Sequence, residues 1–169
     1  GTRAIKMSDS TPSATGVQYE VTFMTGATAG TTEELIIDFC SDTPLIGATC
    51  AFAATSVPTI SGPTSSAGTP ATVGSGSPIH TVLITGLTMA QNTQYTVTLT
   101  GGITNPTTDT TFYARVLTYD TGNGSTYAPA NVTGGATTPG TYVDYGGAAL
   151  STVDQVTVTA RVMETLTFC

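Results

Sequence analysis

Charged side chains are scarce in this chain: they make up 9 % of its 169 residues, against about 25 % in an average soluble domain. The only positively charged side chains are Arg3, Lys6, Arg115 and Arg161, and the formal net charge is −7. Because such a surface repels a phosphate backbone, we expect no nucleic-acid partner. No apolar run reaches the roughly 18 residues that cross a bilayer, so we also expect no membrane span.

Residues that commonly carry out catalysis are also few. His80 is the only histidine, it opens an expected strand, and the chain has no Gly-x-Ser-x-Gly motif, so a Ser–His–Asp site is not expected. One histidine also cannot supply a His-based metal site. The acidic residues are scattered, and Glu33 and Glu34 face opposite sides of an expected strand, which argues against paired carboxylates for glycoside hydrolysis. We predict that the protein is not an enzyme and has no cofactor or bound metal.

Segments that alternate apolar and polar residues recur between turn signals, and threonine, at 39 of 169 positions, supplies much of their polar face. This period of two is typical of strands with one buried face, a setting that suits a β-branched residue such as threonine. The spacing predicts an all-β protein, an antiparallel β-sandwich of about 7–8 strands without substantial helix. We expect an immunoglobulin-like or jelly-roll-like arrangement within one domain, residues 1–169. The expected strands are Arg3–Met7, Val17–Phe23, Glu33–Phe39, His80–Thr85, Gln94–Thr100, Thr111–Tyr119, Thr141–Tyr145 and the run from Val156.

Three segments are less clear. Glu33–Phe39 could also be helical, since Thr31 and Glu34 match a capping box, although the paired isoleucines favour a strand. Residues 57–78 are rich in Ser, Gly and Pro and predict a loop with at most one edge strand. Asp120–Ser125 is similar to a calcium loop but carries one carboxylate, and turn chemistry explains it without an ion.

The C-terminal run from Val156 to Cys169 is longer than a typical strand of about 5–6 residues. Its valines at 156, 158 and 162 share a face with Leu166 and Phe168, and this apolar face is interrupted by Glu164. We expect the first half to complete the domain's own sheet and residues 165–169 to pair with a neighbouring subunit. Leu166, Phe168 and Cys169 form this expected inter-subunit strand. The alternative donated strand is residues 1–7, anchored by Ile5 and Met7; it ranks second because it is short and positively charged.

The three cysteines divide into a pair and a single residue. Cys40 and Cys50 flank a short segment with Pro and Gly and are predicted to form a disulfide in an oxidising compartment. A ring of this size stabilises by roughly 2–3 kcal/mol on the chain-entropy model. Cys169 is the odd cysteine, which suggests an intermolecular bond, a free thiol or the cut end of a longer precursor.

Four stretches together carry a family resemblance: Thr2–Val17, Ile36–Cys40 with Cys50, Thr111–Val116, and Val156–Val162 with Glu164–Cys169. They resemble a secreted, Thr-rich β-domain family of surface proteins from ultra-small candidate-phyla bacteria. The resemblance covers nearly the whole chain in order. It implies export and a role at the cell surface, and it brings no known activity or catalytic residues.

These observations predict an extracellular structural protein of the cell surface. We expect identical subunits to polymerise into a pilus-like filament by donating a terminal strand to an open sheet edge of the neighbour. The alternative is a monomeric adhesin or carbohydrate-binding module, for which surface glycans would be the partners. Three tyrosines of the C-terminal third are the candidate aromatic contacts in that case: Tyr127, Tyr142 and Tyr145.

Overall fold

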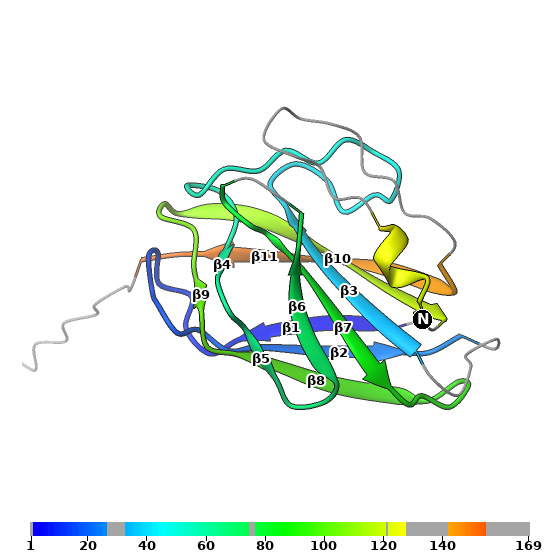
Figure 1. Ribbon diagram of the computed structural model, residues 1–169. Helices are drawn as coiled ribbons and strands as arrows, with labels where there is room; N and C mark the ends of the chain where they lie inside the picture. Colours follow the sequence, from blue (N-terminus) through cyan, green and yellow to red (C-terminus); the bar gives the residue numbers. More distant parts are fainter. Residues whose placement is uncertain (1, 27–32, 75–76, 121, 128–141, 155–169) are drawn as a thin grey trace, which may run out of the picture.

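The computed structural model describes residues 2–26, 33–74, 77–120, 122–127 and 142–154, which form two facing antiparallel sheets (Figure 1). The first sheet has the order β1-β2-β8-β5, and the second has the order β11-β10-β3-β7-β6. A short pair, β4-β9, forms a third ladder. The first sheet consists of β1 (Arg3–Met7), β2 (Tyr19–Met24), β8 (Gln94–Thr100) and β5 (Thr64–Ser65). The second consists of β11 (Asp144–Thr152), β10 (Thr110–Asp120), β3 (Glu33–Cys40), β7 (Thr81–Leu87) and β6 (Thr69–Val73).

The predicted all-β, antiparallel architecture without substantial helix is confirmed. The one helical element in the described part of the chain is the short 3-10 turn η1 (Gly124–Thr126). The described residues form eleven strands rather than 7–8, and three of the eleven have only two residues: β5, β4 (Thr59–Ile60) and β9 (Ile103–Thr104). The orders β1-β2-β8-β5 and β3-β10-β11 correspond to the A-B-E-D and C-F-G orders of immunoglobulin-type sandwiches. Here β6 and β7 extend the second sheet beyond β3.

The main core lies between the two sheets and is built from alternate residues of their strands. In β2, inward-facing residues are fully buried and alternate with exposed or half-buried ones, as the period of two predicts. Phe39 of β3 links the layers: its ring packs against Tyr19 at 5.4 Å and against Phe112 at 6.1 Å between centroids. Such edge-on aromatic pairs add to the free energy of apolar burial.

Strand β3 departs from alternation because both of its faces are covered. All eight residues from Glu33 to Cys40 are buried. The outer face of β3 and β10 carries a second, smaller apolar cluster of Ile36, Leu117, Tyr119 and Tyr127, with Ile46 packed against it. The loop after β3 and the segment at η1 therefore cover this sheet on the outside, and they enclose charged side chains as well as apolar ones.

Two sequence predictions of strand position need correction. Residues 57–78 contain β4, β5 and β6 rather than at most one edge strand. β11 pairs with β10 over residues 144–152, whereas the sequence predicted a short strand at 141–145. The Gly- and Ala-rich sequence of β11 has low intrinsic strand preference, but pairing along nine residues of β10 stabilises it. The run 156–169 lies outside the described residues.

Candidate functional site

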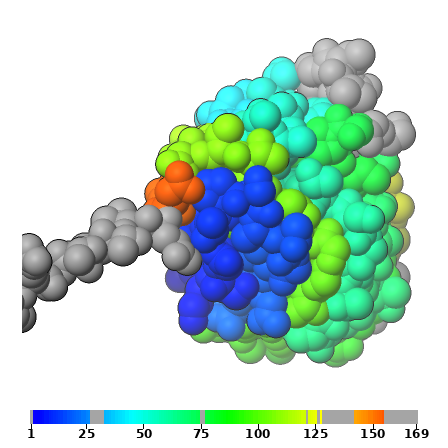
Figure 2. Space-filling view, turned by 90° about the vertical axis from the view of Figure 1, so that its left-hand side faces the viewer, coloured from blue at the N-terminus to red at the C-terminus, as the bar shows by residue number. Residues whose placement is uncertain are grey.

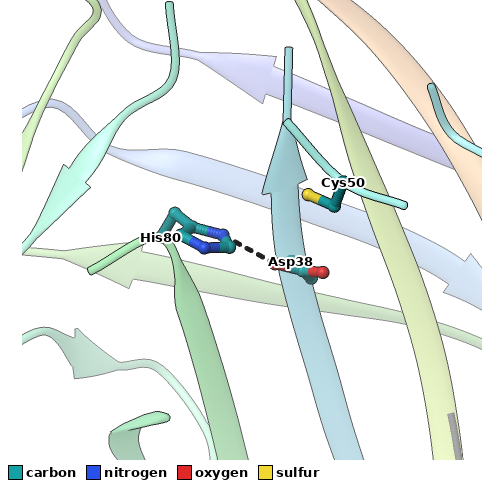
Figure 3. Close-up of side chains that lie close together, drawn as sticks. All are labelled: Asp38, Cys50 and His80. Atoms are coloured by element: carbon teal, nitrogen blue, oxygen red, sulfur yellow. Dashed lines mark hydrogen bonds and ion pairs between the residues drawn. The ribbon is translucent and has the colours of Figure 1, made fainter. Parts of the chain in front are cut away.

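A group of buried polar side chains occupies the outer side of the second sheet, centred on Asp38 of β3 (Figure 3). Asp38 Oδ1 lies 2.8 Å from His80 Nδ1 and accepts a hydrogen bond from Thr81 Oγ1 at 2.7 Å. The other carboxylate oxygen accepts a short hydrogen bond from the Tyr127 hydroxyl. Asp38 and His80 are 0 % and 4 % exposed. The carboxylate is therefore satisfied by three groups from two separate parts of the chain, residues 80–81 and Tyr127.

Burial raises the pKa of Tyr127 well above its ordinary value, and the neighbouring negative charge of Asp38 raises it further. The charge of Arg115 opposes this shift to a lesser degree. Arg115, on β10, is fully buried and donates to the carbonyls of Thr43 and Ala48. A buried guanidinium thus ties the loop after β3 to the sheet that it covers.

Glu34 performs a related task at the other end of β3. Its carboxylate accepts the backbone N–H groups of Gly122 at 3.0 Å and Gly124 at 2.6 Å. These bonds hold the turn that resembled a calcium loop, with a carboxylate accepting from the turn's N–H groups. Carboxylates that accept backbone N–H bonds are strong, charge-assisted partners.

The predicted disulfide is confirmed: Cys40 and Cys50 are bonded, with their Cα atoms 5.3 Å apart. Both cysteines are buried, and Phe52 packs against them. Phe52 also lies on the His80 ring, with 4.0 Å between centroids. The disulfide therefore lies next to the buried polar side chains around Asp38, and it closes the loop that covers these side chains.

Asp38 and Thr81 both face the same ring nitrogen of His80. Thr81 Oγ1 lies 3.4 Å from His80 Nδ1, the nitrogen that faces Asp38 at 2.8 Å, whereas in a Ser–His–Asp site the nucleophile lies beside the other ring nitrogen. All three side chains are buried. The ligand atoms of Asp38, Cys50 and His80 lie within 4.8 Å of one another, but Cys50 is in a disulfide, whose sulfur lacks the thiolate charge that binds metals. In the oxidised protein, the arrangement fits a structural role.

The two predicted inter-subunit strands have different outcomes. Leu166, Phe168 and Cys169 lie outside the described residues. Ile5 and Met7 lie in β1, which pairs with β2 of the same chain, and they are half-buried against the main core. In this structure the alternative donor strand is thus part of its own domain.

Strands β1 and β11 end the two sheets on the same side of the sandwich. Arg3 of β1 forms an ion pair with Asp144 of β11 at 2.8 Å, and its side chain is 2 % exposed. At the other end, the N–H of Val153 donates to the carbonyl of Ser10. Figure 2 shows the N-terminal segment and the end of β11 next to each other on one face. Among the described residues, no strand pairs with the outer edge of either β1 or β11.

The tyrosines proposed as aromatic contacts separate in the structure. Tyr127 is buried in the second cluster. Tyr142 and Tyr145 are 37 % and 48 % exposed, and their rings form an edge-on pair with centroids 5.4 Å apart.

Sequence reasoning missed the roles of Glu34, Asp38 and Arg115. The available signal was the position of Asp38 inside the apolar stretch Ile36–Phe39, because a charge there must find buried partners. Those partners, His80, Thr81 and Tyr127, are 42 to 89 positions away in the sequence.

No family model, curated protein or solved structure matches this chain. The resemblance to a secreted Thr-rich family therefore stays a prediction. Within the described ranges, the structure contains no helix that is long and apolar enough to cross a membrane.

Proposed function

We propose that this protein is a non-catalytic structural subunit of an extracellular surface filament, joined to its neighbours by strand donation. The observation that carries the proposal is the position of β11. It already occupies the place beside β10, so this position does not account for the strand-like alternation of residues 156–168. In the proposal, residues 165–169 pair with another copy of the chain, with Leu166 and Phe168 as anchors.

The acceptor in this proposal is the outer edge of β11, where both sheets end. Unpaired backbone groups at such an edge can bind an extra strand. The inward-facing residues of β11 include Gly146 and Ala148, which pair with Val116 and Ala114 of β10. The Arg3 side chain lies where a Cβ at Gly146 would stand, so in this proposal a donated strand contacts Arg3 as well as Ala148.

The energy balance makes assembly sensitive to single anchors. Burying Leu166 and Phe168 contributes roughly 3–6 kcal/mol at about 1.5–3 kcal/mol per large apolar side chain. Ordering a free tail costs about 1–2 kcal/mol per residue, which offsets this gain over the five residues 165–169. The net stability then comes from backbone hydrogen bonds and the remaining contact surface.

Paired variants test the donated strand and the acceptor edge of β11 separately. Phe168→Asp should abolish polymers, while Thr167→Asp, on the polar face of the same run, should preserve them. Ala148→Lys places a charge on the inward face of the acceptor edge and should block assembly. Ala149→Lys, on the exposed outer face, is its control.

Size-exclusion chromatography and negative-stain microscopy report the polymer, and circular dichroism reports the fold. Lysine can extend its ammonium to solvent from the edge, so folded monomers are expected for Ala148→Lys. Wild-type protein that stays monomeric would refute the proposal. Equal polymer yield from Phe168→Asp and Thr167→Asp would exclude the C-terminal anchor and favour β1 as the donor.

The exposed pair Tyr142 and Tyr145 favours a second candidate, a monomeric adhesin or carbohydrate-binding module. Exposed aromatic rings offer apolar faces to ligands while their hydroxyls remain hydrated. In this case a glycan array should show binding by the monomer that Tyr145→Ala weakens. Unchanged binding after that substitution would exclude the tyrosine pair as the contact.

A further inference from the structure

We propose that the reduced protein binds one Zn²⁺ ion through Cys40, Cys50, His80 and Asp38. In the oxidised protein, the Cys40–Cys50 disulfide replaces the metal ion at this site. The proposal is independent of the filament function. It rests on the convergence of four side chains with zinc-binding chemistry, shown in part in Figure 3.

The ligand atoms are already close to a zinc arrangement. Those of Asp38, Cys50 and His80 lie within 4.8 Å of one another, and Cys40 Sγ is 3.9 Å from Asp38 Oδ2. Tetrahedral zinc, with bonds of about 2.0–2.3 Å, separates its nitrogen and oxygen ligands by about 3.4 Å and two sulfurs by about 3.8 Å. Shifts of about an ångström in side chains would therefore suffice.

The chemistry of the donor set also fits zinc. Two thiolates with one imidazole and one carboxylate make a four-coordinate set of borderline-soft donors. His80 Nδ1 and Asp38 Oδ1 now lie at hydrogen-bond distance, 2.8 Å, and in the zinc form the metal ion replaces the proton between them. The hydrogen bond from Thr81 to Asp38 would orient the carboxylate as a metal ligand, the usual role of groups around a metal site.

The redox step balances. A phosphine reductant takes oxygen from water to become the phosphine oxide, and its two electrons with two protons convert the disulfide into two thiols. Zn²⁺ then displaces both thiol protons to the buffer. In the reverse direction, a small-molecule or protein disulfide accepts two electrons from the thiolates, the Cys40–Cys50 bond forms and zinc is released.

Either occupant fixes the same loop. The disulfide closes residues 40–50 over the second sheet, and a zinc ion between the same cysteines would close it as well. The loop would thus remain attached to the sheet before oxidation, in a compartment where thiols stay reduced.

The test uses the full chain with Cys169→Ser, which removes the third thiol. After anaerobic phosphine treatment and removal of the reductant, the protein is titrated with Zn²⁺ against a chromophoric chelator and with Co²⁺. We expect one bound ion, a cobalt–thiolate charge-transfer band, and no binding by the oxidised protein.

Ligand variants decide the assignment. Cys50→Ser and His80→Gln should each weaken zinc binding by at least about 100-fold. Loss of a group that only orients a metal ligand weakens binding by at most about 100-fold. Glu20→Gln, an exposed acid of the opposite sheet, should not change it. Circular dichroism separates folding from binding, and zinc-induced refolding of a reduced, unfolded chain would support the proposal. It is overturned if the reduced protein binds no zinc, if the oxidised protein binds equally well, or if His80→Gln binds like its parent.

Discussion

Replacing Asp38 is the most direct test of what the buried polar group does for the fold. Asp38→Ala removes the acceptor of three groups: His80, Thr81 and Tyr127. Hydrogen bonds to charged groups contribute about 1.5–3 kcal/mol each, and buried donors left without partners cost similar amounts. The expected loss is therefore at least about 4 kcal/mol, a large part of the 5–15 kcal/mol that stabilises a typical domain.

Asp38→Asn is the matched control because it preserves the size of the side chain. His80 and Thr81 both contact Oδ1, and an amide oxygen at this position can still accept from them. In place of Oδ2, the Asn amide nitrogen can donate to the Tyr127 hydroxyl oxygen once the hydroxyl proton of Tyr127 has rotated away. We expect Asn to cost about 1–3 kcal/mol, which is less than Ala.

Guanidinium unfolding at pH 7, followed by circular dichroism, measures both losses. Non-reducing peptide mapping must show the Cys40–Cys50 bond in every variant, so that the comparison reports only on Asp38. If Asp38→Ala is too unstable to purify, Tyr127→Phe and Asp38→Asn still give a measurable order of stability. An Asp38→Ala protein within about 1 kcal/mol of wild type, with an unchanged denaturant slope, would refute the structural role of the carboxylate.

One further prediction concerns the buried tyrosines, and another concerns a glycine with positive φ. Burial raises the pKa values of Tyr19 and Tyr127, so the folded protein keeps phenol protons that the unfolded chain loses near pH 10. The contribution of these tyrosines to the free energy of unfolding should be complete below pH 10 and fall above it by about 1.4 kcal/mol per pH unit per tyrosine. Urea unfolding from pH 8 to 11 measures this loss. Tyr127→Phe should reduce the slope of unfolding free energy against pH. Gly102 has φ +57°, and an added Cβ would lie 1.7 Å from the carbonyl oxygen of Ser61. Gly102→Ala should therefore lower the melting temperature far more than Gly47→Ala, which has φ +81° but open space around it and should cost about 1–2 kcal/mol; equal effects would contradict the steric argument.

The amino-acid sequence alone determined the class of the fold. Alternation within Val17–Phe23 and Thr111–Tyr119 predicted strands because successive side chains point to opposite faces of a sheet. The disulfide was also predictable from local sequence. Cys40 and Cys50 are only ten positions apart, and closing so short a ring costs little chain entropy.

Tertiary structure decided which strands are neighbours and what covers them. β11 is a strand because β10 pairs with it, and its Gly- and Ala-rich sequence carries little signal of its own. β1 and β11 meet at one side, where Arg3 pairs with Asp144 across 141 positions of sequence. Asp38 can be buried because its carboxylate has three hydrogen-bond partners that are distant in the sequence. Local periodicity determines which side chains of a strand face the core. Long-range strand pairing determines which hydrogen-bond partners surround a buried charged side chain such as Asp38.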